Sequence, residues 1–66
     1  MSSELPRYFH SEMHHSKIRE AIAASKDPHR YVAAWFFDVA YEDVGKEQRS
    51  QAKIANYNYL YRTFGG

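Results

Sequence analysis

His10 and His14 are the first pair of residues in this chain whose spacing could do chemistry. Residues four apart lie on one face of a helix, so the two imidazoles could bind the same metal ion. A metal site needs at least one more ligand, and the nearby carboxylate of Glu12 falls on a different face. His14 and His15 instead flank an apolar stripe, where their protonation would make an interface mildly sensitive to pH. We therefore expect no metal and no cofactor, and histidines that are solvated or at the rim of a surface.

Three basic residues open the last third of the chain at helical spacing, Lys46, Arg49 and Lys53, and Asn56 follows them. Arg and Asn side chains read base edges in the major groove of DNA, and two helices joined at Gly45 would form a helix-turn-helix. Four acidic residues in the same region would repel phosphate: Asp38, Glu42, Asp43 and Glu47. The formal net charge is only +1, which gives little attraction for a polyanion. A DNA-binding transcriptional regulator of helix-turn-helix type is therefore our alternative hypothesis.

Catalysis has little support in the residue types of this chain. It has no cysteine, and its three glycines form no phosphate-binding loop, because two of them stand at the C-terminus. Histidines and carboxylates are present, but no spacing marks a catalytic dyad or triad. A helical chain of 66 residues also has little room for a pocket that excludes water. We therefore expect no enzymatic activity.

The candidate side chains must be positioned by helices, and the first of these is predicted over residues 11–26. Residues 17–24 are strong helix formers without Gly or Pro, and Ser11 is a suitable N-cap. Asp27 and Pro28 then mark a boundary, since Pro disfavours helix at the residue before it and fits the first helical position. We expect four residues of the first helix to form its buried stripe: Ile18, Ala21, Ile22 and Ser25.

The central helix is predicted over residues 28–44, ended by Gly45 in a left-handed conformation. In the run 31–41, ten of eleven residues are apolar or aromatic, and Asp38 is the exception. A small core needs only one apolar stripe, so we expect this helix to bury two faces. The second face predicts a homodimer, because so small a chain without disulfides usually needs another source of stability. We assign self-association to four residues: Trp35, Phe36, Phe37 and Ala40. The alternative is that this helix is simply the centre of a three-helix bundle.

The third helix is predicted over residues 46–64, with Gly65 at its end. A strand over 56–61 is the competing interpretation, but residues 47–53 before it favour a helix without a break. A helical wheel places six residues on the arc that should face the core: Ser50, Ile54, Tyr57, Leu60, Tyr61 and Phe64. Five residues fall on the opposite, polar side: Gln48, Gln51, Ala55, Tyr59 and Arg62.

Tyrosines of the third helix are the candidates for binding a partner. Tyr59 falls on the polar side beside Arg62, and an exposed Tyr next to an Arg is typical of an interface hot spot. Tyr57 and Tyr61 fall on the apolar arc, with their rings in the core and their hydroxyls at the rim. We therefore assign partner binding to these four residues.

Together these elements predict a small all-α domain of three helices over residues 11–66, which follows a flexible N-terminal arm over 1–10. The first residues lack the features of a signal peptide, and a charge interrupts the longest apolar block, so we expect a cytoplasmic protein without a membrane span. Our first hypothesis is a non-enzymatic module that binds a larger protein stoichiometrically, as an inhibitor or adaptor. In size and style alone, the chain resembles the small accessory and inhibitor proteins of bacteriophages and mobile elements.

Overall fold

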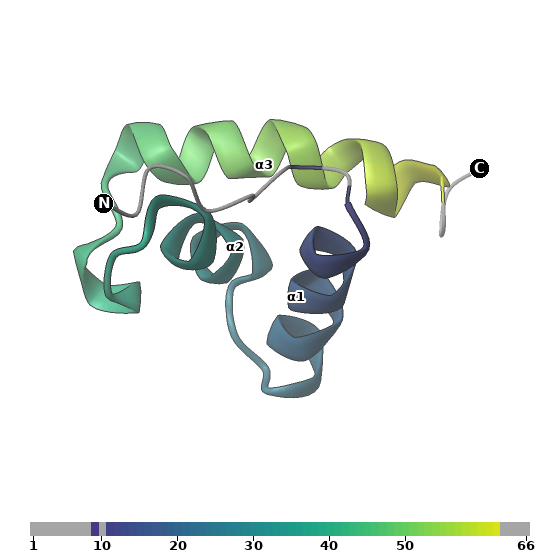
Figure 1. The fold of residues 1–66 in the computed structure, drawn as a ribbon, viewed down its shortest axis with the longest axis horizontal. Coiled ribbons are helices and arrows are strands. Elements are labelled where there is room, and N and C mark those ends of the chain that lie inside the picture. The colour runs from purple at the N-terminus through teal and green to yellow at the C-terminus, as the bar shows by residue number, and fades with distance from the viewer. Residues whose placement is uncertain (1–8, 10, 63–66) are drawn as a thin grey trace.

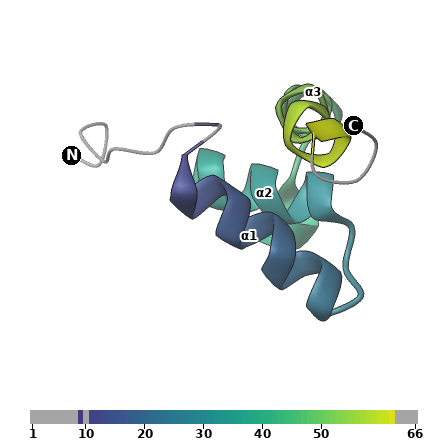
Figure 2. The same ribbon diagram turned by 90° about the vertical axis from the view of Figure 1, so that its right-hand side faces the viewer.

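Three α-helices and one short 3-10 helix are present in the part of the chain that the computed structural model describes, residues 9 and 11–62. In chain order they are α1 (Glu12–Ala23), α2 (Pro28–Phe37), the 3-10 helix η2 (Tyr41–Asp43) and α3 (Lys46–Leu60). The helix α2 packs against both α1 and α3, and α3 lies across the top of the other two (Figure 1). Figure 2 shows α3 almost end-on above α1 and α2. The predicted small all-α domain with three helices is confirmed.

Polar side chains cap the first turns of α1 and α2 as the sequence predicts. The Ser11 hydroxyl accepts a hydrogen bond from the backbone N–H of His14 at 3.1 Å. The Asp27 carboxylate accepts one from the backbone N–H of His29 at 3.0 Å, and Pro28 occupies the first helical position. These bonds satisfy amides that have no partner inside a helix, so the starts of both helices are set by neighbouring residues.

The end of α1 comes earlier than predicted, at Ala23. Ser25 adopts a left-handed conformation with φ of 59°. The backbone N–H of Ser25 donates to Ile22 O at 3.1 Å, and that of Lys26 donates to Ala21 O at 2.8 Å. This pair of bonds is the Schellman arrangement that closes many helices, here with Ser where Gly is commoner. Ser25 is therefore exposed and does not extend the buried stripe, and Ile22 is also half-exposed, at 50 %.

The predicted helix over 28–44 is wrong in its second half, because α2 ends at Phe37. Asp38 has a φ of 61°, and the backbone N–H of Val39 donates to Ala34 O at 3.0 Å, which closes the helix. Asp enters the left-handed region more easily than most residues, so it can end a helix where Gly is absent. Gly45 does not end a helix either: it is the extended N-cap residue of α3.

Arg30 holds the connection between α2 and α3 against α2. Its guanidinium donates to Tyr41 O at 2.8 Å and to Glu42 O at 3.2 Å. The guanidinium also lies 5.2 Å from the centre of the Tyr41 ring, and the Tyr41 hydroxyl accepts a bond from Asp27 N at 3.2 Å. The eight residues 38–45 between the two helices are therefore fixed by contacts with the start of α2.

The helix α3 buries the opposite face from the one predicted. Its buried residues are Ala52, Ala55 and Asn56, whereas Ile54, Tyr57 and Tyr61 are exposed at 68 %, 62 % and 72 %. Ser50 is exposed as well, and of the predicted core arc only Leu60 packs against the core; Phe64 lies outside the described residues. Small side chains bring two helix axes close together, so the alanine face packs more tightly on α2 than a face of rings would.

The core between the helices is small. Its fully buried apolar residues come from all three helices: Ile18, Ala21, Val32, Ala33 and Ala52. Larger side chains pack around them and stay partly buried: Phe9, Trp35, Phe37, Val44, Tyr59 and Leu60. Two polar side chains, His14 and Asn56, are completely buried beside these residues. The shortage of large buried apolar groups makes these polar contacts important for stability.

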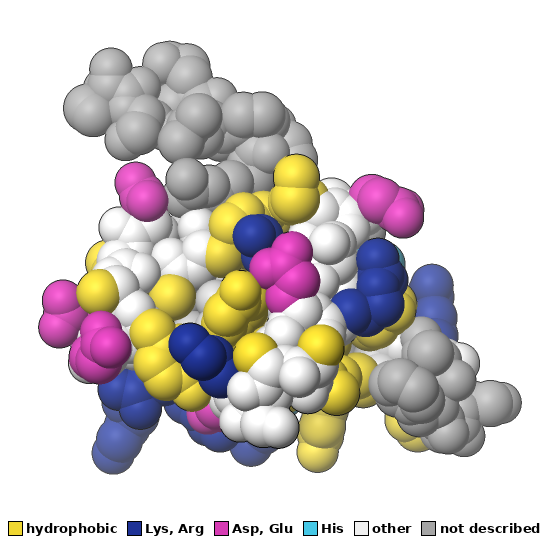
Figure 3. All heavy atoms as spheres, turned by 90° about the horizontal axis from the view of Figure 1, so that it is seen from below, with side chains coloured by type: hydrophobic (Ala, Val, Ile, Leu, Met, Phe, Trp, Pro, Cys, Tyr) yellow, Lys and Arg dark blue, Asp and Glu magenta, His cyan; other side chains and the backbone are white. Residues whose placement is uncertain are grey.

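Much of the surplus apolar surface of α2 is covered by the chain itself. The ring of Phe36 stacks on Phe9 at 3.9 Å between centroids, and the Trp35 ring lies parallel to that of His14 at 6.5 Å. Phe9 falls in the predicted N-terminal arm, whose other residues lie outside the described part. Ala40 is exposed but lies beyond the end of α2. Seen from below, the molecule shows hydrophobic side chains interspersed with charged ones (Figure 3).

Candidate functional site

Three exposed residues line the outer surface of α3, and we call Ile54, Tyr57 and Tyr61 the outer row. They are spaced by three and four residues, so they share the helix face that points away from the core. Each leaves more than half of its surface in water. Exposed apolar residues are common singly, but a row on one face is typical of a contact surface. Tyr57 and Tyr61 were predicted as partner-binding residues, and the structure places both where a partner could reach them.

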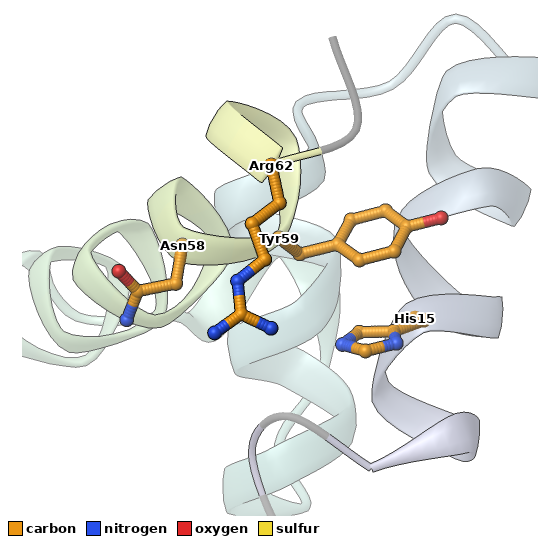
Figure 4. Close-up of a pocket in the computed structure, with 4 residues that line it drawn as sticks. All are labelled: His15, Asn58, Tyr59 and Arg62. Carbon is orange, nitrogen blue, oxygen red and sulfur yellow. The ribbon is translucent and has the colours of Figure 1, made fainter. Parts of the chain in front are cut away.

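A second feature is a cleft of about 340 Å³ between α1 and the end of α3. It is lined by His15, Asn58, Tyr59 and Arg62 (Figure 4). The Tyr59 ring stacks on His15 at 4.1 Å between centroids, and the Tyr59 hydroxyl accepts a hydrogen bond from Arg19 Nη1 at 3.2 Å. The Arg62 guanidinium lies between the Asn58 side chain and the stacked pair (Figure 4). Arg19 therefore contacts the hydroxyl end of Tyr59, whereas Arg62 lines the cleft itself.

Tyr59 is not the exposed residue that the sequence predicts. It is half-buried and packs against the core, whereas Tyr57 and Tyr61, expected in the core, are exposed. The observed burial of these tyrosines is the reverse of the predicted burial because α3 packs its alanine face against the core. Arg62 is exposed, as predicted, and Tyr59 still reaches the surface through the cleft.

A hydrogen-bonded network that the sequence reasoning missed joins the three helices inside the core. The side-chain amide nitrogen of Asn56 donates to the carbonyl oxygen of Pro28 at 3.3 Å. That bond fixes the orientation of the amide, so its oxygen faces His14 Nε2 at 2.6 Å and must accept a proton from it. The amide nitrogen also lies 3.1 Å from His29 Nδ1, which must then be the acceptor. The network forms only when His14 and Asn56, which are 42 positions apart in sequence, meet in the fold. No local sequence motif therefore predicts it.

His29 is therefore neutral when the network is intact. Burial lowers the pKa of His29, and the positive charges of Arg49 and Lys53 lower it further against the opposing effect of Asp27. Asp27 itself is ion-paired with Arg49 at 2.7 Å. Partial burial raises the pKa of Asp27, but hydrogen bonds from Arg49 and from the backbone N–H of His29 outweigh it, so the pKa lies below its ordinary value.

The four residues predicted to read DNA are not brought together on one surface. Asn56 is fully buried and bonded to three groups, so it cannot reach a base edge. Arg49 is paired with Asp27, and only Lys46 and Lys53 are exposed. The eight-residue connection before α3 is also longer than the turn of a helix-turn-helix. Of these four residues, the two lysines could contact a phosphate backbone, and none is placed to contact a base.

Of the predicted metal-binding pair, His10 and His14, only His14 lies among the described residues. His14 is buried against Asn56, and His10 lies outside the described residues. Within residues 9 and 11–62, no three His, Cys, Asp or Glu side chains lie close enough together to hold a metal ion. No helix in the same part of the chain combines the length and the apolar character needed to cross a membrane.

Comparison with protein-family models, with curated proteins and with solved structures gives no match to this chain.

Proposed function

We propose that this chain is a small non-enzymatic interaction module that binds a larger protein through the outer row of α3. The observation that carries the proposal is the exposure of Ile54, Tyr57 and Tyr61, at 62–72 %, on a helix whose other face is anchored in the core. Tyr is favoured at interfaces because its ring is apolar and its hydroxyl tolerates water. A rigid helix presents such side chains without a large cost in ordering them on binding.

The remaining chemistry-bearing side chains support a binding role rather than catalysis. His14, His29 and Asn56 bond to one another and to the backbone of Pro28, so they serve the fold. Asp27 caps α2 and pairs with Arg49. A protein of this kind acts by covering or bridging a surface of its target, as a stoichiometric inhibitor or adaptor.

The test is capture of a partner by matched variants of the purified protein. Immobilised wild type is exposed to lysate of the encoding organism beside a triple variant, Ile54→Ser with Tyr57→Ser and Tyr61→Ser. We expect a protein to be retained in near-stoichiometric amount by the wild type and lost with the triple variant. Circular dichroism checks that the variant stays helical, as exposed positions should allow.

Ile22→Ser is the matched control, since Ile22 is also an exposed apolar side chain, at 50 %, but lies on α1 and not on α3. It should retain the partner as the wild type does. Equal retention by the folded triple variant would show that the outer row is not the binding surface.

A further inference from the structure

We propose that the cleft between α1 and α3 binds a side-chain carboxylate from an acidic segment of the partner protein. The proposal rests on the proposed function and names the chemistry of the partner. Its site consists of Arg62 and Asn58 beside the stacked rings of His15 and Tyr59, and Arg19 lies outside the lining, bonded to the Tyr59 hydroxyl.

The positive charge around the cleft is not neutralised by any carboxylate of the described residues. Neither Arg19 nor Arg62 is ion-paired with a carboxylate of the described residues. Glu20, the acid next to Arg19 in sequence, instead bonds to Lys17 at 3.4 Å and to the Tyr31 hydroxyl at 3.0 Å. These two bonds hold the pKa of Glu20 below its ordinary value, so that carboxylate is already engaged elsewhere. The Arg62 guanidinium in the cleft, with Arg19 at the Tyr59 hydroxyl, leaves a positive potential that an anion would neutralise.

The hydrogen-bond donors that line the cleft suit a carboxylate. The Tyr59 hydroxyl accepts a hydrogen bond from Arg19 Nη1 at 3.2 Å and points away from Arg62 and Asn58 (Figure 4), so the cleft is faced by the Tyr59 ring. The planar guanidinium of Arg62 offers paired N–H groups that match the two oxygens of a carboxylate. The Asn58 amide adds a further donor on the far side of Arg62 (Figure 4). The stacked rings of Tyr59 and His15 would contact the methylene groups of an Asp or Glu side chain.

The cleft suits an acidic protein segment better than a nucleic acid. Nucleic acids need several cations in line along a backbone, whereas this cleft concentrates its charge in a volume of about 340 Å³. Arg62 directly follows Tyr61, the last residue of the outer row, in sequence. Both residues are exposed, so a partner that wraps around this end of α3 could contact the outer row and place one acidic side chain in the cleft. The volume is ample for one such side chain and its water.

The experiment titrates isotopically labelled protein with a short, acetylated and amidated peptide of consecutive glutamates, followed by NMR. We expect saturable shifts of the Arg19, Arg62 and Tyr59 side-chain signals, and none with the matching peptide of glutamines. Arg62→Gln should weaken the apparent affinity at least about threefold, as loss of one exposed ion pair predicts. Arg19→Gln with Arg62→Gln should abolish the saturable shifts. Lys53→Gln, which lowers the net charge equally outside the cleft, should leave the affinity unchanged.

Three results would overturn the proposal. They are no saturable shift at the cleft, an equal loss of affinity in Lys53→Gln, or tighter binding of duplex DNA or inorganic phosphate at the same residues. Backbone spectra of each variant confirm that the fold is intact before the affinities are compared.

Failure here is distinguishable from failure of the proposed function. The peptide titration uses the purified chain without any partner, and the capture experiment changes only the outer row. A partner lost with the outer-row variant but bound normally by Arg62→Gln would contradict the cleft alone. Peptide binding at the cleft without any captured partner would contradict the outer row alone.

Discussion

Asn56 connects the three helices through a single side chain. Its amide contacts His14 on α1, and both Pro28 and His29 on α2. We predict that Asn56→Ala lowers the free energy of unfolding by about 3 kcal/mol, because it leaves a buried imidazole N–H and a backbone carbonyl without partners. Urea denaturation followed by circular dichroism measures the loss.

Asn58→Ala is the matched control, since Asn58 lies two residues further along α3 and is exposed. It should change the free energy of unfolding by less than about 0.5 kcal/mol. A similar small effect for Asn56→Ala would mean that the network contributes little to stability.

His29 predicts how stability depends on pH. Its pKa lies below the ordinary value of 6.5 in the folded chain, mainly through burial, and Arg49 and Lys53 act in the same direction while Asp27 opposes them. Below pH 6.5 the unfolded chain therefore binds a proton at His29 more readily than the folded chain. The stabilising contribution is complete above that pH and is lost as the pH falls toward the folded pKa.

The measurement compares urea midpoints of wild type and His29→Gln at about pH 7.5 and about pH 5.5. We expect the midpoint of the wild type to fall more on acidification than that of the variant. The pKa of Asp27 is also lowered, but its contribution is lost only below its ordinary value of 3.8, so the two effects occupy separate windows. Parallel curves for the two proteins would contradict the role of His29.

At the scale of elements, the end of α1 tests the conformation of Ser25. A left-handed residue with a Cβ atom is strained, and Gly is not. Ser25→Gly should therefore raise the free energy of unfolding by about 1 kcal/mol. Ser16→Gly, in the middle of α1, should lower it by about 0.5 kcal/mol, since Gly weakens a helix interior. The same chemical change gives opposite signs if the helix ends where the structure places its end.

The orientation of α3 is tested by two isoleucines. Ile18 on α1 is fully buried, whereas Ile54 on α3 is exposed at 68 %. We predict that Ile18→Ala lowers the free energy of unfolding by about 3 kcal/mol, as is usual for a core position. Ile54→Ala should lower it by less than about 0.5 kcal/mol. Thermal melts of both variants measure these changes in stability. A large loss of stability for Ile54→Ala would mean that the face predicted from the sequence is the buried one.

At the scale of the whole molecule, the proposed homodimer has a direct test. Light scattering at micromolar concentration should give about twice the chain mass of 7.8 kDa. Ala40→Glu should return the mass to that of one chain if the dimer forms beside the central helix. Tyr57→Glu should do so if the dimer forms through the outer row. Both positions are exposed, so neither change should unfold the chain, and a single-chain mass for the wild type would contradict self-association.

The sequence by itself determined the helical class and the starts of α1 and α2. Ser11, Asp27 and Pro28 act on amides within a few residues of themselves, so their effect can be read without knowing the fold. It also named Tyr57, Tyr61 and Arg62 as candidates for partner binding, but it placed the rings of Tyr57 and Tyr61 in the core and Tyr59 on the exposed side, the reverse of their burial in the structure. A helical wheel assigns a tyrosine ring to the core in preference to an alanine. It carries no information about which face of α3 fits against α2.

Only the tertiary structure decided which face of α3 is buried. Ala52 and Ala55 allow close packing on α2, and Asn56 becomes a core residue because partners on α1 and α2 satisfy its amide. Because this face is buried, Ile54, Tyr57 and Tyr61 point outward and the Tyr59 ring stacks on His15. Such contacts join residues dozens of positions apart, and their free energy exists only once the helices have met.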